Sequence, residues 1–348
     1  MPTDLLSTWV VNLRRKSRCL FLLGGVQEKR FYMAKLHSAF VDFNDSIVLS
    51  KTKRNEIRVS RNAIRDTIKT WMNDNDKGSV CFCMQGSFAM DTVISPLDDD
   101  EYDVDDGIYL KKYDGVSDQD WPACDTVHNW IKTAVAKQAT SAPVDKNACV
   151  RVVYQRGYHV DIPIYIIKNE RAYLANKQDG WINSDAKDFK FWFSNKCESN
   201  NGQLRRCVRY LKRWKDYNDI DLKGIEITIL ASNSFSQAPD RDDDALRYTV
   251  EEMVSSLNAS FSCVKPVAPN EDLLAGSAED KQRGIIDALQ ELEDVLVFAH
   301  DTNDASEGIN RLREKFGDDF PSGGESGDYR ASVITAAPAV LKRDGRSG

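Results

Sequence analysis

The spacing of hydrophobic residues changes along this chain, and each change predicts a different element. Apolar residues recur every three or four positions between residues 33 and 75, which is typical of amphipathic helices. Turn-forming residues over 74–78 end this pattern, and residues 79–84 are then predicted to form a buried strand. The apolar positions of the helical part are Leu36, Phe40, Phe43, Ile47, Ile57, Val59, Ile64, Ile68 and Trp71.

Shorter elements follow as far as residue 167. Gly86–Ser87 should open a short helix, and residues 98–100 should form a loop. The other predicted elements are a strand over 102–110, a helix over 117–138 with Trp121, Val127, Ile131 and Val135 in the core, and a hairpin of strands 150–154 and 158–167 turned at Arg156–Gly157.

Beyond residue 176 the pattern predicts helices only. Residues 204–214 form an amphipathic segment with a strongly basic face, and further helices are expected at 224–237, 241–257, 278–299 and 304–316. The predicted organisation is a poorly packed leader over 1–32, a core with N-terminal helices over 33–175, a helical domain over 176–320 and a disordered tail over 321–348.

The composition narrows the class of protein. The net charge of −7 disfavours a protein whose main task is to hold nucleic acid backbone, since such domains carry a basic excess. No apolar run approaches the length of a membrane span, so we expect no membrane insertion. The eight cysteines and four histidines match neither a zinc site nor a disulfide framework, which indicates a reducing cytoplasm.

Three aspartates are predicted to meet at one site. Alternate side chains of a strand share a face, so Asp103 and Asp105 project together, and Asp161 shares a face with His159. If the two strands are neighbours, three carboxylates converge and supply the oxygen ligands that Mg²⁺ prefers. Two such ions, about 3.5–4 Å apart, can clamp the attacking and leaving oxygens of an in-line displacement.

Gly86–Ser87 adds what carboxylates cannot provide. Glycine lets the backbone approach a phosphate closely, and the N–H groups at a helix start favour anions. The Ser87 hydroxyl can donate to a phosphate oxygen, and Lys212 with neighbouring arginines could neutralise the rest of a triphosphate. In this order, the strand–turn–helix and the aspartates predict a nucleotidyltransferase site for two metal ions and a nucleoside triphosphate.

Each part also has a simpler interpretation. The acidic run 98–106 could be a solvated loop, Asp161 a structural carboxylate and the basic face of 204–214 the wet side of a helix. His159 is interpreted as a packing or supporting residue rather than a base or metal ligand. Core or helix packing is the preferred interpretation for Cys81, Cys83, Trp192, Tyr210 and Trp214.

These motifs resemble the cGAS/DncV-like nucleotidyltransferase family, and within it the bacterial cyclic-oligonucleotide synthases. The resemblance implies an α+β fold: a polymerase-β-like nucleotidyltransferase core, with a mixed sheet and flanking helices, plus an α-helical domain. It also implies a bilobal arrangement with the active-site cleft between the two. The matching stretches run in the family's order and are 85–88, 103–109, 159–163, 181–185 and 204–214.

The resemblance also implies roles for individual residues. Asp103, Asp105 and Asp161 would be catalytic and hold Mg²⁺ as two ions, with Mn²⁺ as an alternative. The nucleotide-binding residues would be Gln85, Gly86 and Ser87 at the donor phosphates, Lys212 at a phosphate, Ser184 and Asp185 near the nucleotides, and Arg151 on the base side.

Two positions depart from the family pattern. A Pro-Ser-Ser sequence is replaced by Gly224-Ile225-Glu226, which removes a serine hydroxyl and places Glu226 where it would repel phosphate. Met90 stands where relatives have an aromatic residue near the nucleotides. Both changes bear on base preference and product.

The activity implied is synthesis of 3′,3′-cyclic GMP-AMP from ATP and GTP in antiphage signalling, with a downstream effector that the product activates. The tail ending at Gly348 suggests a ubiquitin-ligase-like conjugating partner. Activation by DNA is not expected, because no zinc element or basic surface is evident.

Three other activities remain open. The product could be another cyclic di- or trinucleotide. The same carboxylates could serve a template-free transferase acting on RNA or a small molecule. The chain could also be a non-catalytic module that senses ATP.

Overall fold

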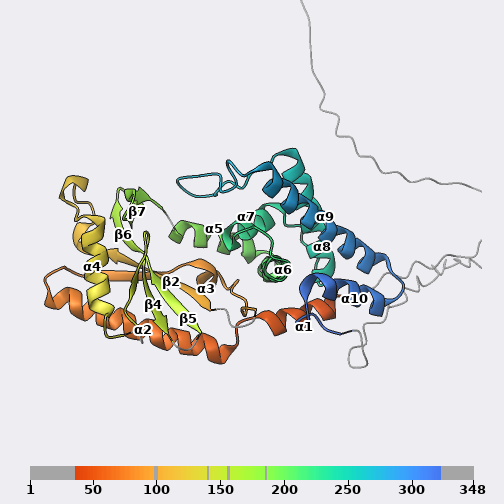
Figure 1. The fold of residues 1–348 in the computed structure, drawn as a ribbon, viewed down its shortest axis with the longest axis horizontal. Coiled ribbons are helices and arrows are strands. Elements are labelled where there is room, and N and C mark those ends of the chain that lie inside the picture. The colour runs from red at the N-terminus through yellow and green to blue at the C-terminus, as the bar shows by residue number, and fades with distance from the viewer. Residues whose placement is uncertain (1–35, 98–100, 139–140, 155–156, 185, 323–348) are drawn as a thin grey trace, which may run out of the picture. The chain divides into compact units, whose positions relative to one another are not determined.

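The computed structural model describes residues 36–97, 101–138, 141–154, 157–184 and 186–322. The predicted leader over 1–32, the loop 98–100 and the tail from residue 323 onward lie outside them. Figure 1 shows a β-sheet with flanking helices, followed in the chain by a group of helices. This mixed arrangement confirms the predicted α+β class.

The sheet contains eight strands in the order β3-β4-β5-β2-β6-β7-β8, with β1 paired to β2. The strands are β1 (Val80–Met84), β2 (Tyr102–Leu110), β3 (Val144–Asp145), β4 (Val150–Tyr154), β5 (Tyr158–Ile162), β6 (Ile164–Lys168), β7 (Arg171–Asn176) and β8 (Gly180–Asn183).

The central strand β2 positions the candidate site. Its first half pairs in parallel with β5, and its second half pairs in parallel with β6. Pro163, which lacks a backbone N–H, lies between β5 and β6, so the single strand predicted over 158–167 is two strands. The carbonyl of Pro163 accepts from Ile108 N at 2.9 Å and keeps the two halves in one ladder.

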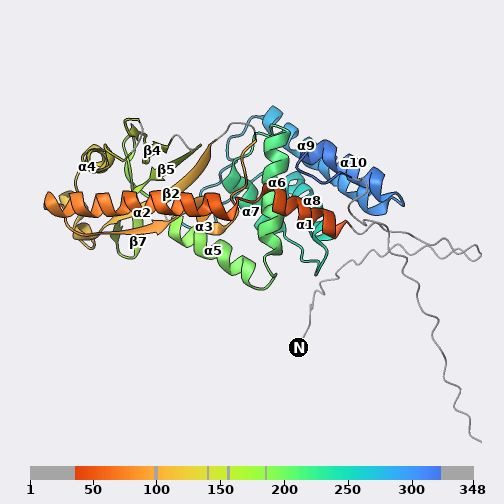
Figure 2. The same ribbon diagram turned by 90° about the horizontal axis from the view of Figure 1, so that it is seen from below.

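Two helices cover one face of the sheet. Helices α2 (Lys51–Asp74) and α4 (Cys124–Val135) pack Ile57, Ile64 and Ile131 against strand residues in one hydrophobic core. Figure 2 shows α2 running lengthwise along the sheet.

A second core joins α1 (His37–Ile47) to the helices after the sheet. These helices are α5 (Ala186–Glu198), α6 (Gln203–Tyr217), α7 (Gly224–Ser234), α8 (Asp242–Ala259), α9 (Glu279–Asp301) and α10 (Ala305–Phe316). The remaining helical elements are α3 (Gly86–Met90) and the 3-10 turns η1 (Lys111–Tyr113) and η2 (Asp118–Asp120). No helix among the described residues is both long and apolar enough to cross a membrane.

Several predictions about packing were wrong. Cys81 is exposed, because alternate residues of a strand face opposite sides and Phe82 is the residue that faces Arg65 and Lys69 of α2. Cys83 is half-buried and packs against the small core that contains Tyr109 and Tyr165. Val59 is 63% exposed, since it faces away from the sheet on α2.

Other differences concern element boundaries. Helix α4 begins only at Cys124, because Pro122 precedes it, and Trp121 instead packs against Trp181 at 5.4 Å. Strand β8 extends the sheet past residue 176, which contradicts the expectation of helices only, and β3, β7 and α5 were not predicted. The predicted domain boundaries stay a prediction. The seven cysteines within the described residues are free, in agreement with the absence of a disulfide framework.

Candidate active site

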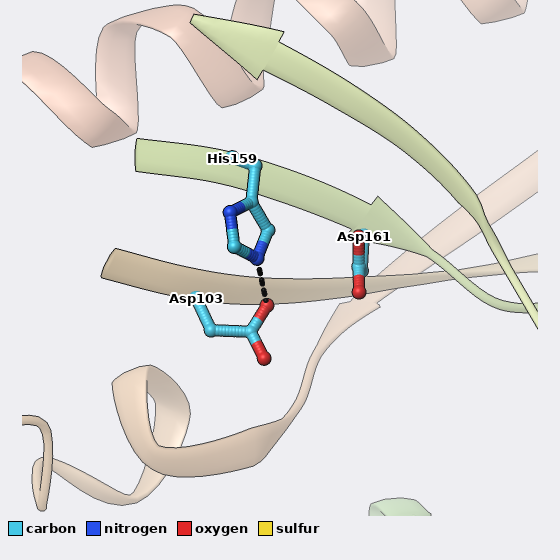
Figure 3. A group of neighbouring side chains, drawn as sticks. All are labelled: Asp103, His159 and Asp161. Carbon is cyan, nitrogen blue, oxygen red and sulfur yellow. Dashed lines mark ion pairs between the residues drawn. The ribbon is translucent and has the colours of Figure 1, made fainter. Parts of the chain in front are cut away.

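The parallel register of β2 and β5 brings the three aspartates together. Asp103 lies opposite His159, and Asp105 lies opposite Asp161. Potential ligand atoms of Asp103, His159 and Asp161 all lie within 4.8 Å of one another. Figure 3 shows these side chains extending from the two strands into one space. The arrangement can hold a divalent cation through carboxylate oxygens.

The electrostatics of the group leave negative charge uncompensated. Burial, together with the neighbouring carboxylates of Asp103 and Asp161, raises the pKa of Asp105 to about 7. Burial acts in the same direction on Asp103, but the hydrogen bond from His159 and the nearby cationic side chains outweigh it and lower that pKa. A bound cation would relieve the repulsion that raises the pKa of Asp105.

Arg151 lies directly opposite Asp161 in the β4–β5 ladder. Its guanidinium donates from Nε to Asp161 Oδ1 at 2.6 Å and from Nη2 to Asp161 Oδ2 at 2.7 Å. Nη2 also lies 3.5 Å from Asp103 Oδ1. Arg151 therefore orients and partly neutralises the carboxylates, while its expected role beside a nucleotide base stays a prediction.

His159 bridges two carboxylates. Nδ1 lies 3.0 Å from Glu101 Oε2, and Nε2 lies 2.8 Å from Asp103 Oδ1, the ion pair drawn in Figure 3. Burial lowers the pKa of His159, but its hydrogen bonds to the two carboxylates act more strongly and raise it. Glu101 was overlooked in the sequence, where it is one more acidic residue in an acidic run.

The turn between β1 and α3 touches the carboxylates. Gly86 has φ +61°, and a Cβ built there would lie 2.0 Å from Asp105 Oδ2. The backbone N–H of Gln85 donates to the Asp105 carbonyl at 2.9 Å. Glycine at this position therefore permits both the left-handed backbone and the close approach of the carboxylate.

Gln85 has a structural role in addition to its predicted role in binding a phosphate. Its side-chain oxygen accepts from the Tyr165 hydroxyl at 3.1 Å, and its Nε2 donates to the Tyr109 hydroxyl at 3.4 Å. The residue is 3% exposed. The amide is thus held from behind by two tyrosines, and its contact with a donor phosphate stays a prediction.

Two cavities open beside the aspartates, with volumes of about 470 and 840 Å³. Both are lined by Ser87, Asp103, Lys212 and Gly224. The smaller cavity also has Gln85, Gly86, Met90, Asp105, Ser184, Phe189, Lys223, Ile225, Thr228, Lys265, Val267 and Ala268 in its wall. The larger one adds Thr92, Glu101, Tyr102, His159, Lys215, Asp216 and Asp219.

Lys212 comes to these cavities from the opposite side, on α6. Its ammonium donates to the Thr92 carbonyl at 3.1 Å and to Thr92 Oγ1 at 3.2 Å. Burial is the main cause that lowers its pKa to about 8. Its neighbours Arg209 and Arg213 are also buried, so the interpretation of this face as solvated is wrong at these three positions.

The remaining predicted positions have different outcomes. Ser184 follows β8 and lines the smaller cavity, whereas Asp185 and Gly348 lie outside the described residues. Glu226 is 1% exposed and accepts from the Lys223 backbone N–H at 2.7 Å. It therefore caps the start of α7 and is not among the residues that line the two cavities, while the expected repulsion of phosphate by Glu226 stays a prediction.

Lys223 and Lys265 were not anticipated, although both line the smaller cavity. Lys223 directly precedes α7, and Lys265 lies between α8 and α9. Neither position carries a spacing signal, so only the folded chain reveals them.

Comparison with known proteins agrees with this geometry. A family model described as "Cyclic GMP-AMP synthase DncV-like, nucleotidyltransferase domain" matches residues 80–165, which contain all three aspartates. A cyclic GMP-AMP synthase of Escherichia coli is 24% identical over 294 residues, covering 68% of this chain and 67% of the relative. A c-di-GMP synthase of Roseivirga ehrenbergii is 22% identical over 281 residues, covering 69% of this chain and 72% of the relative.

Solved structures share the fold. A mutant of the Vibrio cholerae dinucleotide cyclase DncV in complex with ATP and GTP superimposes with a TM-score of 0.71 at 18% identity, covering 83% of this chain and 98% of that one. Escherichia coli DncV bound to 3′-deoxy GTP gives a TM-score of 0.68 at 18% identity, covering 82% and 97%. The predicted polymerase-β-like core is confirmed. Residues 80–165 thus match the DncV-like nucleotidyltransferase domain, and the chain is similar to DncV in sequence and in fold.

Proposed function

We propose that the protein makes 3′,3′-cyclic GMP-AMP from ATP and GTP. The observation that carries this proposal is the pair of cavities that share Ser87, Asp103 and Lys212. Both volumes fall in the range of about 300–1,000 Å³ that is usual for small-molecule sites, so two nucleotides can lie on either side of the carboxylates. Relatives named as cyclic GMP-AMP synthases support the product, while the c-di-GMP synthase makes another cyclic dinucleotide the alternative.

The aspartates fit a divalent metal. Three carboxylates meet, and burial together with the carboxylates of Asp103 and Asp161 raises the pKa of Asp105 to about 7. We propose that Asp103, Asp105 and Asp161 hold two Mg²⁺ ions, or Mn²⁺ in their place. When bound, the ions would lower the pKa of the attacking hydroxyl and stabilise the charge on the leaving pyrophosphate.

The chain's own residues bind and orient the nucleotides. Ser87, at the start of α3, can donate its hydroxyl to a phosphate of the donor nucleotide. Lys212 can provide a charge-assisted contact from the opposite wall. The apolar side chains of Met90, Phe189 and Ile225 line the smaller cavity and can contact the flat face of a base.

The reaction follows in two equivalent steps. The 3′-hydroxyl of one nucleotide attacks the α-phosphate of the other, a new P–O bond forms, pyrophosphate leaves and the hydroxyl proton passes to solvent. The linear product then reorients, and its remaining 3′-hydroxyl attacks the remaining α-phosphate. A second pyrophosphate leaves as the ring closes.

Pyrophosphate release tests this proposal. Purified protein with Mg²⁺, ATP and GTP should release pyrophosphate, and release should fall by at least about 1,000-fold in Asp103→Asn, since the metal site supplies several kcal/mol of transition-state stabilisation. Release should need both nucleotides. No release above background from folded wild-type protein would leave a non-catalytic ATP sensor, and transfer to added RNA without cyclic product would favour the template-free transferase.

The biological setting is proposed from the family resemblance. We propose a cytoplasmic role in antiphage signalling, in which the product activates a separate effector. We also propose conjugation through Gly348 by a ubiquitin-ligase-like partner. Deletion of Gly348 should abolish conjugates in cells that carry the partner enzymes, and conjugates that persist would contradict this part.

A further inference from the structure

Glu101, His159 and Asp103 form a chain of contacts that the proposed reaction does not explain. Both ring nitrogens of His159 face a carboxylate, at 3.0 Å from Glu101 Oε2 and 2.8 Å from Asp103 Oδ1. The His159 side chain is 9% exposed, whereas those of Glu101 and Asp103 are 42% and 58% exposed. A nearly buried ring thus holds a carboxylate that is otherwise open to the cavities.

The sheet fixes the ring in this place. Asp103 and His159 are direct partners in the parallel β2–β5 register, and every residue of β5 is buried. With one nitrogen at Glu101 and the other at Asp103, a rotation of the ring would break both contacts. Figure 3 shows the ring of His159 extending from β5 toward Asp103 on β2.

The contacts of Asp103 with His159 and Arg151 are both made by the same carboxylate oxygen. Oδ1 receives the contact with His159 at 2.8 Å and the contact with Arg151 at 3.5 Å. Both contacts fall on Oδ1, so they can set the orientation of the carboxylate without occupying Oδ2. Asp161 is oriented in a similar way by the two hydrogen bonds of Arg151.

We propose that His159, anchored by Glu101, is a positioning residue that holds the Asp103 carboxylate in the orientation required for cation binding. This inference rests on the proposed metal-dependent function. In this role His159 acts through Asp103, with which its Nε2 forms an ion pair at 2.8 Å, and the test below separates this role from direct ligation of the metal. Groups that orient metal ligands in this way typically contribute about 10- to 100-fold to metal affinity.

The test measures binding of Mn²⁺ to the full chain without nucleotide, using the electron paramagnetic resonance signal of free Mn²⁺. His159→Ala should weaken binding about 10- to 100-fold. His159→Gln, whose amide can still donate to Asp103, should restore part of the affinity, and Glu101→Gln should weaken it less. The Mg²⁺ concentration for half-maximal pyrophosphate release should rise in the same order, while kcat at saturating Mg²⁺ should recover.

His300→Gln is the matched control, because His300 also lies between two carboxylates, at 3.3 Å from Asp244 and 2.7 Å from Asp301, but on α9. It should leave Mn²⁺ binding unchanged. Thermal unfolding of each variant confirms that the compared proteins are folded.

Two results would overturn the inference. Wild-type Mn²⁺ affinity in folded His159→Ala would remove the positioning role, and loss in both His159 variants as complete as in Asp103→Asn would make His159 a ligand. Failure of the proposed function is recognised separately. In that case wild type binds Mn²⁺ and His159→Ala binds it weakly, but neither consumes ATP or GTP.

Discussion

At the residue scale, Gly86 and Asp105 lie too close together for a side chain at position 86. A side chain at Gly86 would need to occupy the space of the Asp105 carboxylate, since its Cβ would lie 2.0 Å from Oδ2 and 3.1 Å from Cγ. The backbone there also has φ +61°, which favours glycine. Gly86 therefore sets the distance between the turn that is proposed to bind phosphate and the proposed metal ligands.

We predict that Gly86→Ala lowers product formation by about 100-fold or more, because displacing a catalytic group by about 1 Å can have that effect. Gly180→Ala is the control that distinguishes displacement of the Asp105 carboxylate from backbone strain alone. Gly180 has φ +77° with no neighbouring atom within 4 Å of a built Cβ, so its substitution strains the turn without moving a carboxylate. Rates of product formation in the two variants check the prediction, and similar losses in both would contradict it.

Lys212 gives a prediction about pH. Its pKa is lowered to about 8, so the ammonium is present below that pH and is lost as the pH rises through 8. Because kcat/KM reports on groups of the free enzyme, kcat/KM for the nucleotides should fall above about pH 8.

Lys212→Met should lower kcat/KM by about 10- to 100-fold at pH 7, the range expected for a lost charge-assisted contact, and should abolish the decline above pH 8. Lys187→Met, which removes an exposed lysine of α5, is the control and should keep the decline. Persistence of the decline in Lys212→Met would show that another group titrates.

At the element scale, the basic face of α6 binds the segment that follows the Gly86–Ser87 turn. Arg209 donates to the Asp91 carbonyl at 2.6 Å, Lys212 to the Thr92 carbonyl at 3.1 Å and Arg213 to the Ser95 carbonyl at 2.7 Å. Arg205 donates to the Met90 carbonyl at 3.2 Å. Helix α6 thus binds four backbone carbonyls of the segment 90–95, and these contacts keep α3 beside the aspartates.

We predict that Arg209→Met lowers the free energy of unfolding by about 1–3 kcal/mol, because it removes a buried guanidinium that donates to the Asp91 carbonyl and to the Asn44 side chain. Chemical denaturation measures the change. Arg311→Met on α10 removes an arginine that is 52% exposed and should change stability by less than about 0.5 kcal/mol. Equal stability of the two variants would contradict the proposed holding role of α6.

Local patterns predicted the parts of the site that lie within one element. Alternation in β2 placed Asp103 and Asp105 on one face, and the Gly86–Ser87 turn predicted a short helix. Strand pairing decides the rest. The β4–β5 register alone puts Arg151 opposite Asp161, and the β2–β5 register alone puts His159 opposite Asp103.

The basic face of α6 shows a different limit of prediction from sequence. Its spacing is that of any amphipathic helix, and its partners are backbone carbonyls more than 110 positions earlier in the chain. A pattern of side chains cannot reveal such partners, so burial of Arg209, Lys212 and Arg213 could not be predicted from periodicity. The break at Pro163, in contrast, has a local cause, because proline cannot donate to a strand ladder, and the prediction of one strand over 158–167 did not take it into account.

At the scale of the whole molecule, the segment after Ser87 contributes to both hydrophobic cores. Phe88 and Val93 pack in the core beneath the sheet, whereas Met90 and Ile94 pack in the core of the helices. The two cavities open at this junction, with the aspartates supplied by the sheet and Lys212 by α6. Substrate binding therefore depends on both cores being formed.

The most direct test of this account is mass spectrometry of the products formed from Mg²⁺, ATP and GTP, with the double variant Asp103→Asn/Asp105→Asn beside wild type. We predict a mass of cyclic GMP-AMP from wild type alone, with nuclease digestion giving two 3′–5′ linkages. Another cyclic dinucleotide would keep the mechanism and change the product. Linear products only, or no product from folded wild-type protein, would contradict the claim that these aspartates catalyse ring formation.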